Sequence, residues 1–562
     1  MAKSPAIQRN RWWVLGGILV LALVIRWWGI GTTDMLGDEA ADAFRSIGYV
    51  DYLGSSFQTQ PIDWYNHQPL PGWASLSFHD DPPLFFMIQH AFFAMLGDSA
   101  LVARLPAIFA GTLATLLLYL ITRKVLEDRE RRKEAAYVPS EVIEWVASTA
   151  AALFAIEPAT VGIFRTSLIE PILIFFILLN LFFFLKMLEN RKYWVLFGLS
   201  LGAVALTKYT GAFLLPAYVL YLAIAHRSMF KDWRLYASLL LALIVFSPVI
   251  IYNMEMYKAR GHFDLQLAYL LHQSTPEWTG LVGKDQSPFS DIVKNLASNY
   301  GIPLLAVVAG GLAAAWQWRK KYAARGLWLI AAYLAFLVTL FIGIGSANRF
   351  LAMLSPALMV LAALALVELW RAMPGTRWNM LFRTVVVLFL AWELGLSAWR
   401  NIIAFPSYGV AGLDAYLTQE MGGIQSSAVP QADNSHLNDI INAFAAHRSD
   451  KPEARVVIVY NDNVTLPTLE WIFYRRFFYH AIPALFVQNF EKVLQTQGAG
   501  YFSGFTIYFV QSTDHTLLSP TKLTETAGDE FEQWVMSKGI NPAKTILASD
   551  GQPAFRVYKF SL

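Results

Sequence analysis

The dominant pattern along the chain is a series of apolar runs separated by short polar or basic segments. Several runs, such as "WWVLGGILVLALVIRWWGI" at 12–30, contain about 18 to 22 residues, and a helix needs about 20 to cross a bilayer. The pattern therefore predicts a mainly α-helical, polytopic membrane protein. No small-residue cleavage site follows the first run, so we interpret it as a retained signal anchor.

The basic residues between the runs predict how the chain threads through the membrane, because Lys and Arg are enriched in cytoplasmic loops. Lys3, Arg9 and Arg11 place the N-terminus inside. The run 82–97 has only about 14 apolar residues, which is short for a span, and we expect it to lie in the outer interface. All the main basic segments then fall inside: 123–133, 186–192, 226–234, 318–325 and 371–383.

This threading gives about eleven spans, an odd number that leaves the C-terminus outside. The spans are 12–30, 101–121, 145–158, 168–186, 193–207, 210–225, 235–252, 301–317, 327–345, 350–370 and 384–403. The two long outer loops are 31–100 and 253–300.

From residue 404 the composition becomes mixed and polar. The runs 455–461 and 505–511 are typical of buried strands, 468–478 is typical of a helix between them, and 554–560 closes the chain. We therefore predict two parts, a transmembrane domain at 1–403 and an extracytoplasmic α/β domain at 404–562.

Composition excludes several classes of function. The net charge of +3 is small and its basic residues are dispersed, which does not favour a nucleic-acid partner. The chain has no cysteine, so disulfides, thiolate zinc sites and a cysteine nucleophile are excluded.

Charged residues outside the basic segments converge on the outer face in this threading. Placing an ionisable group at membrane depth or in a tight membrane turn costs free energy, so such residues are candidates for function. The candidates come from several outer turns: Asp38, Glu39, His79, Asp80, Asp81, Arg104, Arg165, Glu170, Lys208 and Arg349.

Simpler explanations exist for single residues. Arg104, Lys208 and Arg349 could be anchors that extend toward lipid headgroups. Asp34 and Asp42 are expected in solvated loop, and Glu157 could cap a turn. The gathering of many such residues on one side favours a shared functional cavity.

A cavity with a carboxylate, further acids and several cations suits sugar transfer from a polyprenyl-phosphate donor. Cations bind a phosphate at headgroup depth, and a carboxylate takes the proton of an attacking hydroxyl. A lipid phosphate leaves without a partner acid. We therefore expect an inverting displacement with Asp38 or Glu39 as the base.

Several motifs also resemble a known superfamily: "GDEA", "DDPPLFF", "ARLPAIFAGTLATLLLYL", "LTKYTGAFLLP" and "NRFLAMLSPALMVLAALAL". They are similar to dolichyl-phosphate-mannose–protein mannosyltransferases and their bacterial and archaeal relatives, including glycosyltransferase family 39 and the lipid A aminoarabinose transferases. The resemblance covers roughly residues 10 to 370. It implies the GT-C fold, an integral protein of a prokaryotic plasma membrane, and transfer of a hexose or pentose to glycan, lipid or protein.

The resemblance also implies roles for individual residues. Asp38 would be the catalytic base with Glu39 beside it, the loop before Pro82 and Pro83 would border the active site along with short surface helices, and the cations would face the donor phosphate, namely Arg104, Lys208 and Arg349. Two positions depart from the family pattern. Asp81 occupies the usual position of a His, with His79 two places earlier, and Glu170 replaces an Asp.

A metal and two other functions stay open at this point. Asp38, Glu39 and Asp81, together with His79 and Asp80, could supply ligands to Mg²⁺ or Mn²⁺. A lipid-linked sugar flippase or transporter would favour internal repeats and polar groups near the midplane, and we find neither. A third possible function is that of a non-catalytic accessory protein with the same GT-C scaffold.

Overall fold

The computed structural model describes nine stretches of the chain: 5–55, 58–127, 138–273, 275–278, 288–322, 325–372, 377–461, 463–513 and 527–562. Lys3 and residues 128–133 of the basic run lie outside the described residues, as do parts of the segments 253–300, 318–325 and 371–383.

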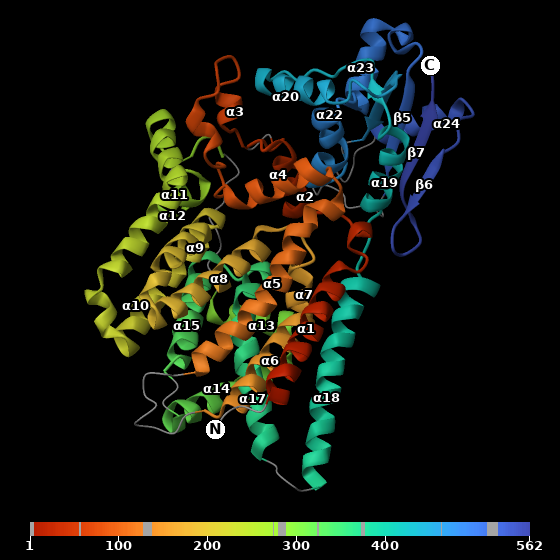
Figure 1. The fold of residues 1–562 in the computed structure, drawn as a ribbon. Coiled ribbons are helices and arrows are strands. Elements are labelled where there is room, and N and C mark those ends of the chain that lie inside the picture. Colours follow the sequence, from red (N-terminus) through yellow and green to blue (C-terminus); the bar gives the residue numbers. More distant parts are fainter. Residues whose placement is uncertain are drawn as a thin grey trace.

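Long apolar helices form the body of the protein (Figure 1). Seven helices in the described part are long and apolar enough to cross a membrane, or eight if one bent pair is a single span. The seven spans correspond to α1 (Pro5–Trp27), α5 (Ala100–Leu126), α8 (Ile169–Glu189), α11 (Trp233–Arg260), α15 (Leu327–Ile344), α17 (Ser355–Ala372) and α18 (Arg377–Ala398). The bent pair is α13 (Phe289–Tyr300) and α14 (Ile302–Tyr322).

Three further predicted spans coincide with shorter helices. They are α6 (Ser140–Ile156), α9 (Trp194–Thr207) and α10 (Leu214–Ala225), with 17, 14 and 12 residues, below the roughly 20 that a simple span needs. The mainly helical, polytopic membrane class is confirmed, whereas the number of eleven spans stays a prediction. Helix α17 is apolar all round and lies inside the bundle, packed against α6 and α14.

Short helices of the segment between α1 and α5 cover one end of the bundle (Figure 1). They are η1 (Ile30–Thr32), α2 (Asp38–Gly48), α3 (Pro61–Trp64), η2 (Gly72–Ser75) and α4 (Leu84–Leu96). Helix α4 has 13 residues and packs against α2 and α5. Its length agrees with the predicted interfacial helix in 82–97.

The remaining short helices of the bundle lie between the longer ones or, in the case of η7, after the last of them. They are α7 (Pro158–Ile163), η3 (Arg191–Tyr193), η4 (Tyr209–Phe213), η5 (Arg227–Lys231), α12 (Leu265–Leu270), α16 (Asn348–Leu351), η6 (Ala352–Leu354) and η7 (Trp399–Ile403).

A five-stranded mixed sheet lies in the C-terminal part, in the order β4-β3-β5-β7-β6. Its strands are β3 (Val456–Tyr460), β4 (Ala484–Phe486), β5 (Thr506–Ser512), β6 (Lys544–Leu547) and β7 (Pro553–Phe560). Strand β3 is parallel to β4 and β5, and β7 is antiparallel to β5 and β6. The predicted strands at 455–461 and 505–511 correspond to β3 and β5, and the closing segment 554–560 forms most of β7. A separate parallel pair joins β1 (Gln425–Ser426) to β2 (Glu453–Ala454).

Helices cover both faces of this sheet. One face packs on α23 (Val487–Gln497), η9 (Ala499–Phe502) and α24 (Ala527–Ser537). The other packs on α19 (Val410–Met421), α20 (Ser435–Ala446), α21 (Leu466–Leu469), η8 (Glu470–Tyr474) and α22 (Arg475–Tyr479).

The apolar core between the sheet and the helices α19 to α22 also includes residues from before the predicted boundary at 403/404. Ala43 and Phe44 of α2 belong to the same buried cluster as Leu413, Ile458 and Tyr479. Helix α2 therefore packs as part of the C-terminal core although it precedes that core by hundreds of residues.

Candidate active site

Asp38 begins α2 and lies beside a cation from a distant turn. Gly37 has a φ of +55°, a conformation that glycine adopts easily, and it turns the chain sharply into the helix. The Asp38 side chain is 57% exposed and forms an ion pair with Arg349 of α16. An accessible carboxylate thus lies at one end of the bundle next to a guanidinium.

Glu170 joins two of the predicted cations. Lys208, which follows α9, donates from Nζ to Glu170 Oε1 at 2.9 Å, and Arg349 Nε lies 3.9 Å from the same oxygen. The ring of Phe350 lies 5.2 Å from Lys208 Nζ and 5.1 Å from the Arg349 guanidinium carbon. Residues from α2, α8, α9 and α16 therefore meet in one group of acids and cations.

Glu39 points inward rather than toward this group. Arg104 donates to it through Nε at 2.6 Å and Nη2 at 3.0 Å, and the Ser167 backbone N–H donates at 2.8 Å. The other Arg104 bonds go to the preceding loop, at the carbonyls of Ile30, Thr33 and Asp34 and at the Thr33 hydroxyl. Neighbouring residues of a helix point in different directions, so Asp38 is exposed while Glu39 is buried.

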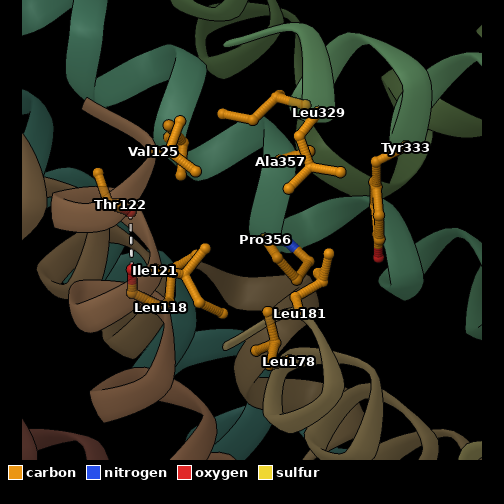
Figure 2. A pocket seen from close by; sticks show the side chains of 12 residues that line it. Leu118, Ile121, Thr122, Val125, Leu178, Leu181, Leu329, Tyr333, Pro356 and Ala357 are labelled. Atoms are coloured by element: carbon orange, nitrogen blue, oxygen red, sulfur yellow. Dashed lines mark hydrogen bonds between the residues drawn. The ribbon is translucent and has the colours of Figure 1, made fainter. Parts of the chain in front are cut away.

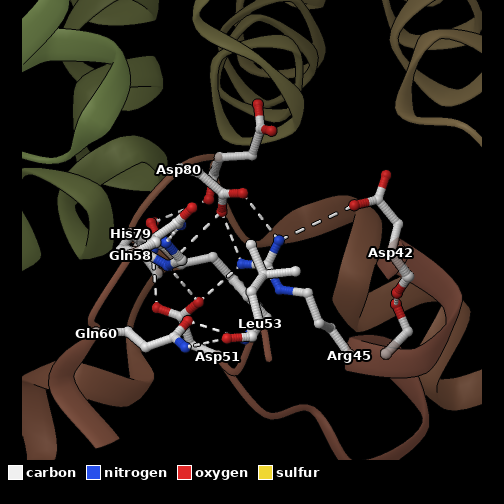
Figure 3. Close-up of polar contacts among 12 residues, drawn as sticks. Asp42, Arg45, Asp51, Leu53, Gln58, Gln60, His79 and Asp80 are labelled. Atoms are coloured by element: carbon white, nitrogen blue, oxygen red, sulfur yellow. Dashed lines mark hydrogen bonds and ion pairs between the residues drawn. The ribbon is translucent and has the colours of Figure 1, made fainter. Parts of the chain in front are cut away.

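A second polar cluster joins α2 to the loop before Pro82 (Figure 3). Arg45 of α2 donates two bonds to Asp80, at 2.9 and 2.7 Å, and one to Asp51 at 2.7 Å. His79 Nδ1 lies 2.6 Å from Asp51, and the His79 ring stacks on Trp278. The sequence reasoning missed Arg45 and Asp51, because nothing in their local pattern distinguishes them from loop charges.

The charges of this cluster shift its pKa values in opposite directions. Although burial acts against it, the Arg45 guanidinium and then His79 hold the pKa of Asp80 well below its usual value. Burial also acts against protonation of His79, and Asp51 and Asp80 outweigh it and raise its pKa. The cluster is therefore an ion network with charged partners.

Two further carboxyl groups are held toward the neutral form. Burial raises the pKa of Asp81 to about 7, with Lys208 opposing and Asp80 adding to the rise. One oxygen of Asp81, Oδ1, is buried without a hydrogen-bond partner. Burial, followed by the charge of Asp38, raises the pKa of Asp42 well above its usual value.

The expectation that Asp34 and Asp42 lie in solvated loop is wrong, since both side chains are buried. Asp42 lies in α2, where its carboxylate is 4.0 Å from Arg45. Asp34 lies at the contact with the C-terminal part. Local polarity gave no sign of these tertiary contacts.

Arg165 and Glu157, which the sequence analysis also considered, bind backbone groups at helix ends. Arg165 donates through Nη1 to the carbonyls of Ile25 and Trp28 at the end of α1. Glu157 accepts from the backbone N–H groups of Ala159 and Thr160 and so caps α7. These bonds give both residues a structural role.

Two of the candidate metal ligands, His79 and Asp80, lie together with Asp51, which the sequence reasoning missed. Among the described residues, the three-ligand group is Asp51, His79 and Asp80, whose ligand atoms lie within 4.8 Å of one another. Arg45 already lies between its two carboxylates and supplies a positive charge. The predicted ligands Asp38 and Glu39 pair with arginines, so metal use stays a prediction.

An apolar pocket between the spans lies apart from this chemistry (Figure 2). It has a volume of about 40 Å³ and its lining residues come from α5, α8, α15 and α17. The polar groups at its edge are satisfied: Thr122 donates to the Leu118 carbonyl and Tyr333 to the Met353 carbonyl. The pocket is a small packing gap.

Comparisons with known proteins agree with the predicted resemblance. Residues 80–252 match the family model described as dolichyl-phosphate-mannose-protein mannosyltransferase. No curated protein sequence matches the chain. These 173 residues include the Asp80-Asp81-Pro82-Pro83 motif and Lys208.

Two solved structures have the same fold across most of the chain. The archaeal oligosaccharyltransferase AglB from Archaeoglobus fulgidus is 14% identical, with 91% of this chain and 70% of that chain covered and a TM-score of 0.51. ArnT from Cupriavidus metallidurans is 14% identical, with 96% and 97% covered and a TM-score of 0.50. The GT-C fold and the resemblance to its mannosyltransferase superfamily are therefore confirmed.

Proposed function

We propose that the protein is an inverting glycosyltransferase that moves a sugar from a polyprenyl-phosphate donor to a hydroxyl group at the outer face of the membrane. The observation that carries this proposal is the exposed Asp38 carboxylate paired with Arg349, beside Lys208 and Glu170. These residues place a proton acceptor next to two cations. The cations can bind a phosphate leaving group, and the carboxylate can accept the proton of the attacking hydroxyl.

The ion pairs suggest how the donor binds. The donor phosphate replaces Asp38 as the partner of Arg349 and takes a second bond from Lys208. Glu170 keeps both cations oriented, because it accepts from Lys208 at 2.9 Å and lies 3.9 Å from Arg349. Donor binding thereby releases the Asp38 carboxylate for the acceptor.

Asp38 then removes the proton of the acceptor hydroxyl as its oxygen attacks the anomeric carbon of the sugar. The new carbon–oxygen bond forms while the bond to the phosphate oxygen breaks from the opposite side, which inverts the anomeric centre. Polyprenyl phosphate leaves with the electron pair, and Lys208 and Arg349 stabilise its charge. The proton ends on Asp38, and no partner acid is needed.

The solved relatives support a lipid-phosphate donor. ArnT is described bound to undecaprenyl phosphate, and AglB in complex with an inhibitory peptide and a dolichol-phosphate. By analogy, the acceptor of this chain is a glycan, a lipid or a protein. The predicted orientation, with the N-terminus inside, puts α2 and the C-terminal domain on the extracytoplasmic side of a prokaryotic plasma membrane.

Sugar transfer by purified protein in proteoliposomes tests the proposal. The vesicles receive labelled polyprenyl-phosphate sugars and a membrane extract as acceptor, and wild type is compared with Asp38→Asn. Asp439→Asn is the matched control, since Asp439 is an exposed residue of α20. We expect Asp38→Asn to abolish transfer and to retain donor binding.

Equal transfer by the variant and the wild type would show that Asp38 is not the base. If wild type transfers no sugar but moves labelled lipid between leaflets, the enzyme proposal fails in favour of a flippase.

A further inference from the structure

Asp34 is buried where the segment between α1 and α2 contacts the C-terminal part. Its side chain accepts from the backbone N–H groups of Tyr408 and Ala411, the latter at 2.7 Å, and from Ser407 Oγ at 3.4 Å. These donors lie at the start of α19, so a carboxylate from a distant segment caps this helix. Free N–H groups and the helix dipole both favour a negative charge there.

The backbone of the same residue continues the connection toward Asp38. Arg104 Nη2 donates to the Asp34 carbonyl at 2.8 Å, and the same guanidinium makes two bonds to Glu39. Glu39 is the second residue of α2 and directly follows Asp38 in sequence. A continuous chain of charge-assisted bonds therefore runs from α19 to the first turn of α2.

The other end of α2 also rests on the C-terminal part. The ring of Phe44 lies 6.0 Å from that of Phe478 and 5.3 Å from that of Tyr479. At Gly48 a Cβ atom would lie only 2.6 Å from Tyr479 Cε1, so the ring packs directly against the helix backbone. Contacts at both ends thus fix α2 in position and direction.

The donor-binding cations do not depend on this support. Lys208 follows α9 and Arg349 lies in α16, and their shared partner Glu170 lies in α8. All three come from the helical bundle. A loss of the Asp34 contact would therefore move Asp38 relative to the cations without removing the cations.

We propose that the C-terminal domain is a positioning element of the active site, and that Asp34 is the positioning residue through which it sets the place of Asp38. This inference rests on the proposed function. Misplacement of a catalytic group by about 1 Å lowers a rate by about 100-fold. Loss of the Asp34 carboxylate should therefore lower kcat and leave donor affinity unchanged.

The experiment compares Asp34→Ala and Asp34→Asn with wild type in proteoliposomes. Asn66→Ala is the control, because Asn66 also contacts the C-terminal part, through Ser435, but at a point that does not lead to α2. Transfer kinetics, donor binding and hydrogen–deuterium exchange of the amides in 35–48 are measured for each protein.

We expect Asp34→Ala to lower kcat by about 10- to 100-fold, with donor affinity unchanged and with faster exchange in 35–48. Asp34→Asn retains one acceptor oxygen for the N–H groups of α19 and should give an intermediate kcat, which separates positioning from general destabilisation. Asn66→Ala should keep the wild-type kcat and wild-type exchange in 35–48.

Wild-type kcat and exchange in both Asp34 variants would overturn the inference. The same holds if Asn66→Ala loses as much kcat as Asp34→Ala, because any loosened contact would then have the same effect. If wild type transfers no sugar, the proposed function fails on its own, and the exchange data still test whether Asp34 holds α2.

Discussion

Arg45 and Asp80 form a two-bonded ion pair, at 2.9 and 2.7 Å, that joins α2 to the loop before Pro82. The same guanidinium reaches Asp51 and lies over the rings of Phe78 and Phe86. Because α2 begins with Asp38 and the loop ends beside Asp81, this pair connects two segments that contribute to the proposed active site. Its loss should affect both stability and catalysis.

Arg45→Met should lower the free energy of unfolding by about 3 kcal/mol, since it leaves two carboxylates without their cation in a buried site. Arg45→Lys keeps the charge but not the planar fork, and should recover only part of this loss. Denaturation of the detergent-solubilised protein measures the change. Arg455→Met, at an exposed arginine, is the control. Equal stability of Arg45→Met and the control would contradict the role of this ion pair.

Lys208→Met should weaken binding of a polyprenyl phosphate about 10- to 100-fold, because removal of one charge from a partly buried ion pair costs a few kcal/mol. Lys208→Arg should retain more affinity than Lys208→Met. Titration of the purified protein with the lipid phosphate checks this. Lys258→Met is the matched control, since the Lys258 side chain is 63% exposed. Unchanged affinity in Lys208→Met would remove Lys208 from the phosphate site.

Glu39 and Arg104 should behave as one structural unit. Glu39→Gln and Arg104→Met should each destabilise the protein, and the double variant should lose less than the sum, with a coupling energy of about 1–3 kcal/mol. Glu39→Gln should also retain more transfer than Asp38→Asn, since Glu39 is buried against Arg104. If Glu39→Gln is inactive while Asp38→Asn is active, Glu39 and not Asp38 is the catalytic base.

The raised pKa of Asp81 predicts how stability depends on pH. An acid whose pKa is higher in the folded than in the unfolded protein stabilises the fold below its unfolded pKa, and this contribution is lost as pH rises through its folded value. For Asp81 the loss extends from about 4 to about 7. Asp81→Asn stays neutral, so its melting temperature should rise relative to that of wild type as pH increases from about 4 to about 7, and the difference should stay constant above this range.

Melting curves of wild type, Asp81→Asn and the control Asp439→Asn at several pH values test this. A difference between wild type and Asp81→Asn that does not change with pH would mean that Asp81 does not titrate in this range.

The local pattern of the sequence determined the class of the fold. Apolar runs of membrane length predicted the helical bundle, and continuous runs of β-branched and aromatic residues predicted β3 and β5, because burial on all sides leaves a signal in consecutive residues. The alternation of spans also brought Asp38, Glu170, Lys208 and Arg349 to one side. Every second turn of a polytopic chain lies on the same face, so this grouping needs no tertiary detail.

Only the tertiary structure decided what each charge contacts. Glu39 follows Asp38 directly, yet Arg104 holds it inward, and Asp34 caps a helix more than 370 residues away. Arg45 gained its importance from Asp51 and Asp80, two carboxylates outside its own helix. A loop charge has the same local sequence pattern whether water or a buried partner stabilises it. That choice depends on which distant segments the packed core brings together.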